Sequence, residues 1–153
     1  MTPEVVWLPW LRGRLTERGY DVKAPHYPGL NLEPVTTTVA KVLADHIFDH
    51  DTVLIGHSGG AALLLALLER IDVTVAQAVL VAGYYTPPGA SDEPVLQSDY
   101  DWAAIKSHVI DLYFINSPND PYGCDDRQGR EMFDLLGGTQ IIRHDGHFGD
   151  HDQ

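Results

Sequence analysis

Three short and largely apolar runs have the length and composition of strands that are covered on both faces of a parallel sheet. They are DTVLIG at 51–56, QAVLVA at 77–82 and IDLYFIN at 110–116. Two weaker segments predict further short strands, one over 21–25 that ends at a proline and one over 139–144. The pattern therefore predicts a buried sheet as the centre of the fold.

Between these strands, apolar residues recur at helical spacing. This spacing predicts helices over 5–18 and 35–49, and GAALLLALLER predicts a helix over 60–70. A short helix is expected from about Asp99, after a long loop rich in Pro and Gly, and a further helix is expected over 126–136, where GG ends it. The succession of helices and strands with short links predicts an α/β fold with a mostly parallel sheet and helices on both faces.

Composition narrows the class of protein. With 153 residues and 44% hydrophobic residues, the chain predicts a single domain over 1–153 with a core of its own. The formal net charge of −12 argues against nucleic acid as a partner, and no segment approaches the roughly 20 apolar residues that cross a bilayer, so no membrane partner is expected. A start without a secretory pattern and the lone Cys124 lead us to expect a cytoplasmic protein.

Candidate chemistry begins where the strand 51–56 runs into the next helix. GHSGG there fits the GxSxG pattern of a nucleophile elbow, with Ser58 at its centre. Gly56 and Gly60 are expected to be glycines because side chains at these positions would collide in the abrupt turn from strand to helix. The N–H of Gly59 would then stabilise an oxyanion at the start of the helix. The alternative is that Ser58 only caps the helix.

Two further polar residues follow other predicted strands. Asp120 ends the segment SPND after the strand 110–116, and His147 lies in HDGHF after the strand 139–144. The order Ser, Asp, His is the one expected of α/β-hydrolases, and reactive groups of such sheets gather beyond the carboxyl ends of the strands. A serine hydroxyl needs a base to take its proton and an acid to orient that base. The sequence therefore predicts a catalytic triad of Ser58, Asp120 and His147.

Each assignment has an alternative. Asp120 in an NDP turn is also a turn former, and Asp125 and Asp126 are rival acids inside the next predicted helix. His144 is the rival base, although it lies at the strand end itself and not in the loop beyond it. Cys124 is an alternative nucleophile, but the acids around it oppose a thiolate.

Two further features bear on ligands. The segment HDGHFGDHD at 144–152 has the composition of a metal site but lacks a spacing such as HExxH, so we expect no metal and no cofactor. Four aromatic residues are candidates to line a substrate pocket, with core packing as the alternative for the first two: Tyr84, Trp102, Tyr122 and Phe148.

With these residues in place, the chain resembles the retinoblastoma-binding-protein-9-like family of small serine hydrolases, which have the α/β-hydrolase fold. The resemblance lies in WLPWL, IGHSGGA, NDP after a buried strand, DW with Trp102, and DGHF, and it covers nearly the whole chain. It implies Ser58 as nucleophile, Asp120 as acid and His147 as base, with hydrolysis of an ester, amide or thioester through an acyl-Ser58 intermediate.

The resemblance also implies two departures. Family members open with a strand and a glycine-containing loop before the part that matches VVWLPWL, and they continue into a final helix after the part that matches GHF. We therefore expect the first strand and the last helix to be missing, and with them the second oxyanion N–H. This predicts weak activity or a homo-oligomer that completes the sheet.

The leading hypothesis is a serine hydrolase of the carboxylesterase or amidase type that acts on a small-molecule ester or amide. The runner-up is a binding or scaffold protein that keeps the fold without catalysis. A metal-dependent hydrolase that uses the C-terminal His and Asp cluster is the third reading.

Overall fold

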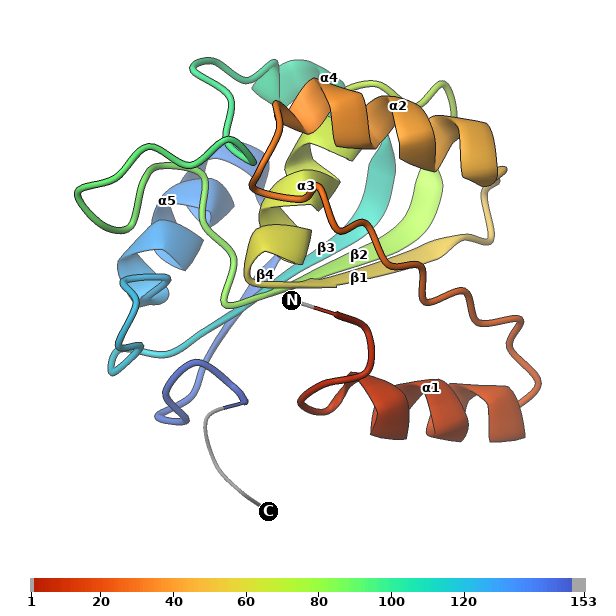
Figure 1. Cartoon of the computed structure of the whole chain (residues 1–153), viewed down its shortest axis with the longest axis horizontal. Coiled ribbons are helices and arrows are strands. Elements are labelled where there is room, and N and C mark those ends of the chain that lie inside the picture. Colours follow the sequence, from red (N-terminus) through yellow and green to blue (C-terminus); the bar gives the residue numbers. More distant parts are fainter. Residues whose placement is uncertain (1, 150–153) are drawn as a thin grey trace.

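A computed structural model describes residues 2–149 of the chain. Its sheet has four strands, all parallel, in the order β1 (Val53–His57), β2 (Val75–Val81), β3 (Val109–Asn116) and β4 (Thr139–Ile142) (Figure 1). Strands that follow one another in the chain therefore lie next to one another in the sheet. The predicted α/β class with a parallel sheet is confirmed, and the predicted strands at 51–56, 77–82 and 110–116 lie within two residues of their observed positions.

The helices lie on both sides of this sheet. Figure 1 shows α2 (Val35–Asp45), α3 (Gly59–Leu68), α4 (Trp102–Ser107) and α5 (Asp126–Leu136) above one face, and α1 (Leu8–Glu17) below the other. The helix predicted over 126–136 has its observed bounds. In the part of the chain that the structure describes, no helix has the length and the apolar character needed to cross a bilayer.

The core lies between α3 and the sheet. Every residue of α3 from Ala61 to Leu68 is buried, which suits a helix that is apolar all round. Below it the strand register aligns Gly56 with Leu80 and Leu80 with Phe114 on one face. Because Leu80 and Phe114 are fully buried, they anchor the strands whose carboxyl ends carry the candidate site.

The opposite face of the sheet is much less covered. Alternate residues point to it, and Val53 and Ile141 are exposed at 41% and 38%, while Val79 and Tyr113 are half-buried. The α1 helix on this side contributes no buried residue. The helix predicted over 5–18 is therefore present, with the shorter bounds Leu8–Glu17, but it does not pack into the core.

One predicted element is wrong and another is too long. The segment 21–25 is not a strand, because a strand needs a partner and no described strand pairs with it; its Lys23 instead forms an exposed ion pair with Asp21. The helix predicted over 35–49 ends at Asp45, since His46 is already extended. Ile47 follows in the loop and is 97% exposed, so it does not share the buried helix face.

Candidate active site

The Ser58 turn joins β1 to α3 with a strained backbone. Ser58 has φ 56° and ψ −122°, a left-handed conformation that costs a side-chain-bearing residue about 1–3 kcal/mol. Its N–H donates to the carbonyl of Val81 on the neighbouring strand at 2.9 Å. A Cβ at Gly56 would lie 2.6 Å from the carbonyl oxygen of Gly60, so glycine is required there. The same expectation for Gly60 is wrong, because a Cβ there would meet no atom within 4 Å.

The side chain of Ser58 points to an imidazole and not to the helix. Its Oγ lies 3.0 Å from Nε2 of His147, and it makes no capping hydrogen bond to α3. The alternative of a helix cap is therefore wrong. Gly59 is the first residue of α3, where backbone N–H groups have no acceptor within the helix. An anionic oxygen at Ser58 would meet the positive end of that helix.

Asp120 and His147 approach from loops after two other strands. Asp120 follows β3 and His147 follows β4, so both lie at the same edge of the sheet as Ser58. His147 Nδ1 donates to Asp120 Oδ2 at 2.7 Å. The Asp120 side chain is fully buried and that of His147 is 8% exposed. The structure thus brings together Ser58, His147 and Asp120 in one hydrogen-bonded chain.

The rival residues lie elsewhere. His144 is exposed in the loop after β4, and Asp125 caps α5 by accepting from the N–H of Arg127 at 3.0 Å. Asp120 does also form a turn, because its second oxygen accepts from the N–H of Tyr122 at 2.8 Å. One carboxylate therefore shapes the turn and orients the imidazole.

Sequence reasoning missed three residues that hold the loop of His147. His57 donates from Nε2 to the His147 carbonyl at 2.7 Å. Ser117 Oγ accepts from the N–H of Asp145 at 3.1 Å, and Asn119 Oδ1 accepts from the N–H of Gly146 at 3.2 Å. The polar run SPND directly after a buried strand was the available signal for Ser117 and Asn119. The His57 ring also packs edge to face against Trp7.

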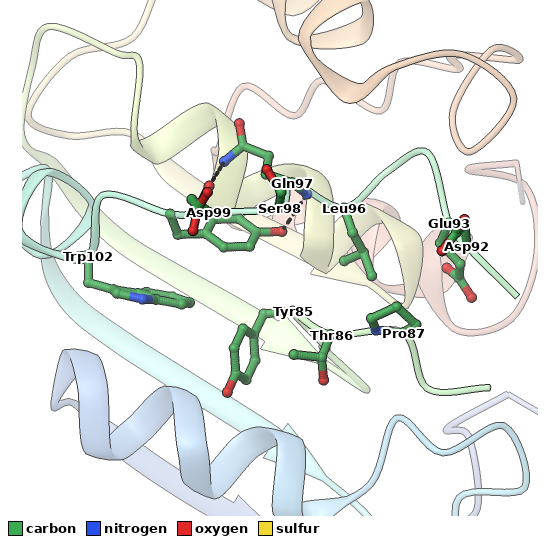
Figure 2. A pocket seen from close by; sticks show the side chains of 11 residues that line it. Tyr85, Thr86, Pro87, Asp92, Glu93, Leu96, Gln97, Ser98, Asp99 and Trp102 are labelled. Carbon is green, nitrogen blue, oxygen red and sulfur yellow. Dashed lines mark hydrogen bonds between the residues drawn. The ribbon is translucent and has the colours of Figure 1, made fainter. Parts of the chain in front are cut away.

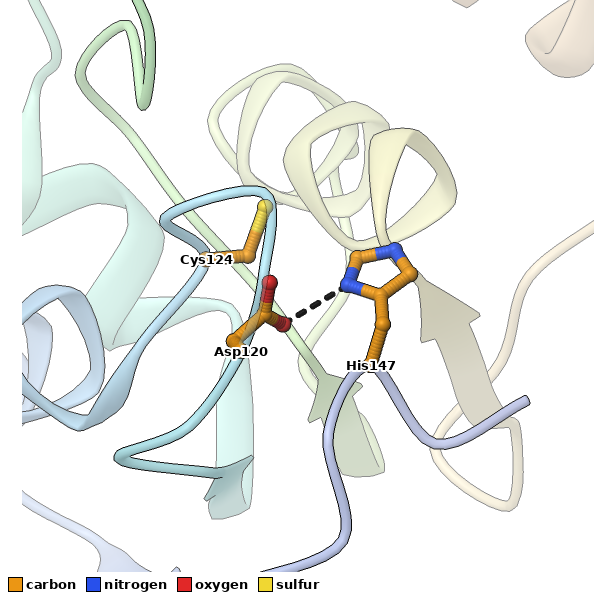
Figure 3. A group of neighbouring side chains, drawn as sticks. All are labelled: Asp120, Cys124 and His147. Atoms are coloured by element: carbon orange, nitrogen blue, oxygen red, sulfur yellow. Dashed lines mark hydrogen bonds and ion pairs between the residues drawn. The ribbon is translucent and has the colours of Figure 1, made fainter. Parts of the chain in front are cut away.

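Cys124 lies beside the same groups, as Figure 3 shows. It is buried, and burial, followed by the nearby Asp120 carboxylate, raises the pKa of its thiol to about 12. At neutral pH the residue is therefore a thiol and a poor nucleophile.

The ligand atoms of Asp120, Cys124 and His147 lie within 4.8 Å of one another, and they are the group within residues 2–149 with the spacing of a metal site. The Nδ1 of His147 is already bonded to Asp120, so a metal ion would have to replace that hydrogen bond. Of the cluster predicted at 144–152, Asp150, His151 and Asp152 lie outside the described residues.

Two of the four predicted pocket aromatics lie close to these groups. Tyr122 packs its ring edge to face on His147 at 4.7 Å and is 59% exposed. Tyr84 is buried, and its hydroxyl lies 3.8 Å from the point where a Cβ of Gly59 would stand. Burial, with the hydrogen bond to Glu93, raises the pKa of Tyr84, so its hydroxyl stays protonated.

The other two have different surroundings. Phe148 follows His147 directly and packs half-buried against the core. Trp102 stacks on Tyr100 and meets the ring edge of Tyr85, and all three line a cavity whose walls include none of Ser58, Asp120 and His147.

Comparisons with known proteins show the family and the fold of the chain. A family model described as serine hydrolase matches residues 3–153. Among solved structures, the ydeN gene product from B. subtilis matches with a TM-score of 0.88 at 20% identity, covering 98% of this chain and 83% of that chain. At that identity the likeness shows a common α/β-hydrolase-like fold. None of the curated protein sequences matches. On the family match over nearly its whole length, the chain belongs to the serine hydrolase family.

Proposed function

We propose that the protein hydrolyses a small ester or amide through an acyl-Ser58 intermediate. The observation that carries the proposal is the hydrogen-bonded chain from Ser58 Oγ to His147 Nε2, at 3.0 Å, and from His147 Nδ1 to Asp120, at 2.7 Å. These separations are within the range in which a base takes a proton from a nucleophile.

In the first half of the reaction, His147 Nε2 takes the Ser58 proton while Oγ forms a bond to the carbonyl carbon of the substrate. The carbonyl oxygen becomes an oxyanion next to the N–H of Gly59 at the start of α3. When the oxyanion collapses, the bond to the leaving alcohol or amine breaks, and the leaving group takes the proton from His147. The acyl group remains on Ser58.

In the second half, His147 takes a proton from water while the water oxygen attacks the acyl carbon. The bond to Oγ breaks, Ser58 recovers its proton from His147, and the carboxylic acid leaves. Asp120 keeps the imidazole in the tautomer with hydrogen on Nδ1 and stabilises the imidazolium that forms in both halves. Its complete burial strengthens this interaction, because little solvent screens it.

The finer identity is part of the same proposal. The shared motifs support a retinoblastoma-binding-protein-9-like carboxylesterase or amidase, and the single cysteine, present as a buried thiol, supports a reducing cytoplasm as its place of action. Tyr122, exposed beside His147, supports a substrate that enters from that side, with Tyr84 and Phe148 as further walls.

Turnover of p-nitrophenyl esters of increasing chain length tests the proposal. Asp120→Asn should lower kcat on the order of 10⁴-fold, because the imidazole then loses its orientation and its charge partner. Ser58→Ala should abolish the acyl-enzyme burst altogether. Ser91→Ala and His144→Ala are matched controls at exposed positions and should keep wild-type rates. Equal rates for Ser58→Ala and wild type would refute the proposed mechanism.

A further inference from the structure

A cavity lies apart from the hydrogen-bonded chain of Ser58. It is open to solvent and has a volume of about 510 Å³, within the range of small-molecule sites, and none of Ser58, Asp120 and His147 lines it. Figure 2 shows Tyr85 on one side and Leu96 on the other, with Trp102 at one end and Asp92 and Glu93 at the other. No step of the proposed mechanism uses a residue that lines this cavity.

Three aromatic rings line the cavity around the end where Trp102 lies. The rings of Tyr100 and Trp102 stack with centroids 5.0 Å apart, and Tyr85 meets the Trp102 ring edge to face at 5.3 Å. Tyr85 donates its hydroxyl proton to Glu131 at 2.7 Å, and this hydrogen bond raises the pKa of the phenol. Burial raises the pKa of Tyr100 as well, so all three rings are neutral at physiological pH and have the negative ring faces that attract a cation.

The charges that line the cavity have a single sign. Asp92, Glu93 and Asp99 contribute carboxylates, and none of the residues that line it is Lys, Arg or His. The formal net charge of −12 for the chain adds to this negative potential. An anionic ligand would be repelled, whereas a cation would be attracted by the carboxylates and by the rings.

The carboxylates do not form a metal site. Within the described residues, the group with metal-ligand spacing is Asp120, Cys124 and His147, and no carboxylate of this cavity belongs to it. Three carboxylates that are spread around a cavity with an aromatic end suit a cation that is larger than a metal ion and has a lower charge density. An organic ammonium has both properties, because its charge is spread over carbon-bound hydrogens that contact ring faces.

We propose that this cavity is a binding site for a small organic ammonium, of the size of choline, with the cationic head against Trp102 and Tyr85. Glu93 at the other end holds the hydroxyl of Tyr84, which lies beside Gly59. The cavity and the candidate oxyanion position therefore lie on two sides of one buried tyrosine. Binding itself does not depend on hydrolysis and is expected in Ser58→Ala as well.

The test is a calorimetric or NMR titration of the whole chain with choline and with its neutral isostere, 3,3-dimethylbutan-1-ol. Choline should bind with a Kd of about 1–10 mM at low salt and at least about tenfold more tightly than the alcohol. Trp102→Leu should weaken choline binding by about fivefold or more and leave the alcohol almost unchanged. Trp10→Leu is the matched control, because Trp10 is 66% exposed on α1, on the other side of the sheet.

A second variant keeps the test decisive if Trp102→Leu fails to fold. Asp92 and Asp99 are exposed, so Asp92→Asn with Asp99→Asn should fold normally, weaken choline binding and reduce its salt dependence. Asp51→Asn, at a side chain that is 87% exposed and does not line the cavity, is the charge control. Equal affinity for choline and the alcohol, or no choline binding at about ten times the expected Kd, would overturn the proposal.

Discussion

The first and last glycines of GHSGG, Gly56 and Gly60, give the sharpest prediction about the turn, because the structure assigns them opposite tolerances of a side chain. A Cβ at Gly56 would lie 2.6 Å from the carbonyl oxygen of Gly60 and 2.7 Å from its carbonyl carbon. Both are backbone atoms of the helix that follows Ser58, so no side-chain rotation relieves the contact. A Cβ at Gly60 would meet no atom within 4 Å.

The magnitude follows from these distances. Two carbon atoms in favourable contact lie about 3.5 Å apart, so Gly56→Ala would have to push β1 and the first turn of α3 apart by about 0.8 Å. Overpacking of this kind costs about 1–3 kcal/mol, and a backbone contact places it near the upper end. A cost of about 3 kcal/mol lowers Tm by about 6–12 °C in a domain of this size. Displacing Ser58 by nearly 1 Å lowers turnover about 100-fold.

Gly60→Ala is the matched variant with the same chemical change. It adds a methyl group in open space, on the first turn of a helix in which Ala is favoured over Gly by up to about 1 kcal/mol. Thermal unfolding and ester turnover of both variants are the assay. Gly56→Ala should lose stability and rate, and Gly60→Ala should keep both. Two variants with equal losses, or a fully active Gly56→Ala, would contradict the described turn.

Further predictions concern Cys124, His57 and the uncovered sheet face. At pH 8 a pKa of about 12 leaves about one thiolate in 10⁴ at Cys124, so iodoacetamide should alkylate the folded protein about 10³-fold more slowly than the unfolded chain; equal rates would contradict its burial. In the unfolded chain the thiol ionises at a lower pH than in the folded protein, because its pKa is not raised by burial. The free energy of unfolding measured in urea titrations should therefore fall as the pH rises above about 9. His57→Phe removes the hydrogen bond to the His147 carbonyl but keeps a ring against Trp7, so kcat should fall about 10-fold or more at unchanged KM; a change in KM alone would contradict a positioning role. On the sheet face that α3 does not cover, Val53 and Ile141 are exposed at 41% and 38%, which leaves apolar surface for a second copy to bury. Light scattering should therefore detect a dimer that Val53→Glu dissociates, and a mass of 16.9 kDa for the wild type would contradict it.

The sequence predicted those parts of the fold that depend on neighbouring residues in the chain, such as strands, helices and the turn between them. The run TVLIG followed by GHSGG and an apolar helix marks the turn at Ser58 without any knowledge of its neighbours. Because parallel strands place their carboxyl ends at one edge, the residues after β3 and β4 also pointed to Asp120 and His147.

The contacts that support the site have no local cause. His57 and His147 are far apart in sequence, and the hydrogen bond between them appears only once β1 and the loop after β4 are assembled. Likewise, Gly60 is the last glycine of the GxSxG pattern but has free space around it, which depends on the packing of distant parts of the chain. The segment 21–25 has strand composition, yet pairing depends on a neighbouring strand and not on composition.

The most direct test of the proposed chemistry is intact-mass analysis after exposure to a fluorophosphonate, followed by peptide mapping. The mechanism predicts one covalent adduct per chain, located on Ser58 and absent from Ser58→Ala. In Asp120→Asn, Ser58 should be labelled far more slowly than in the wild type, because the imidazole is then poorly oriented. A folded wild-type protein that gains no adduct, or gains it on Cys124 or another serine, would contradict the assignment of Ser58 as the nucleophile.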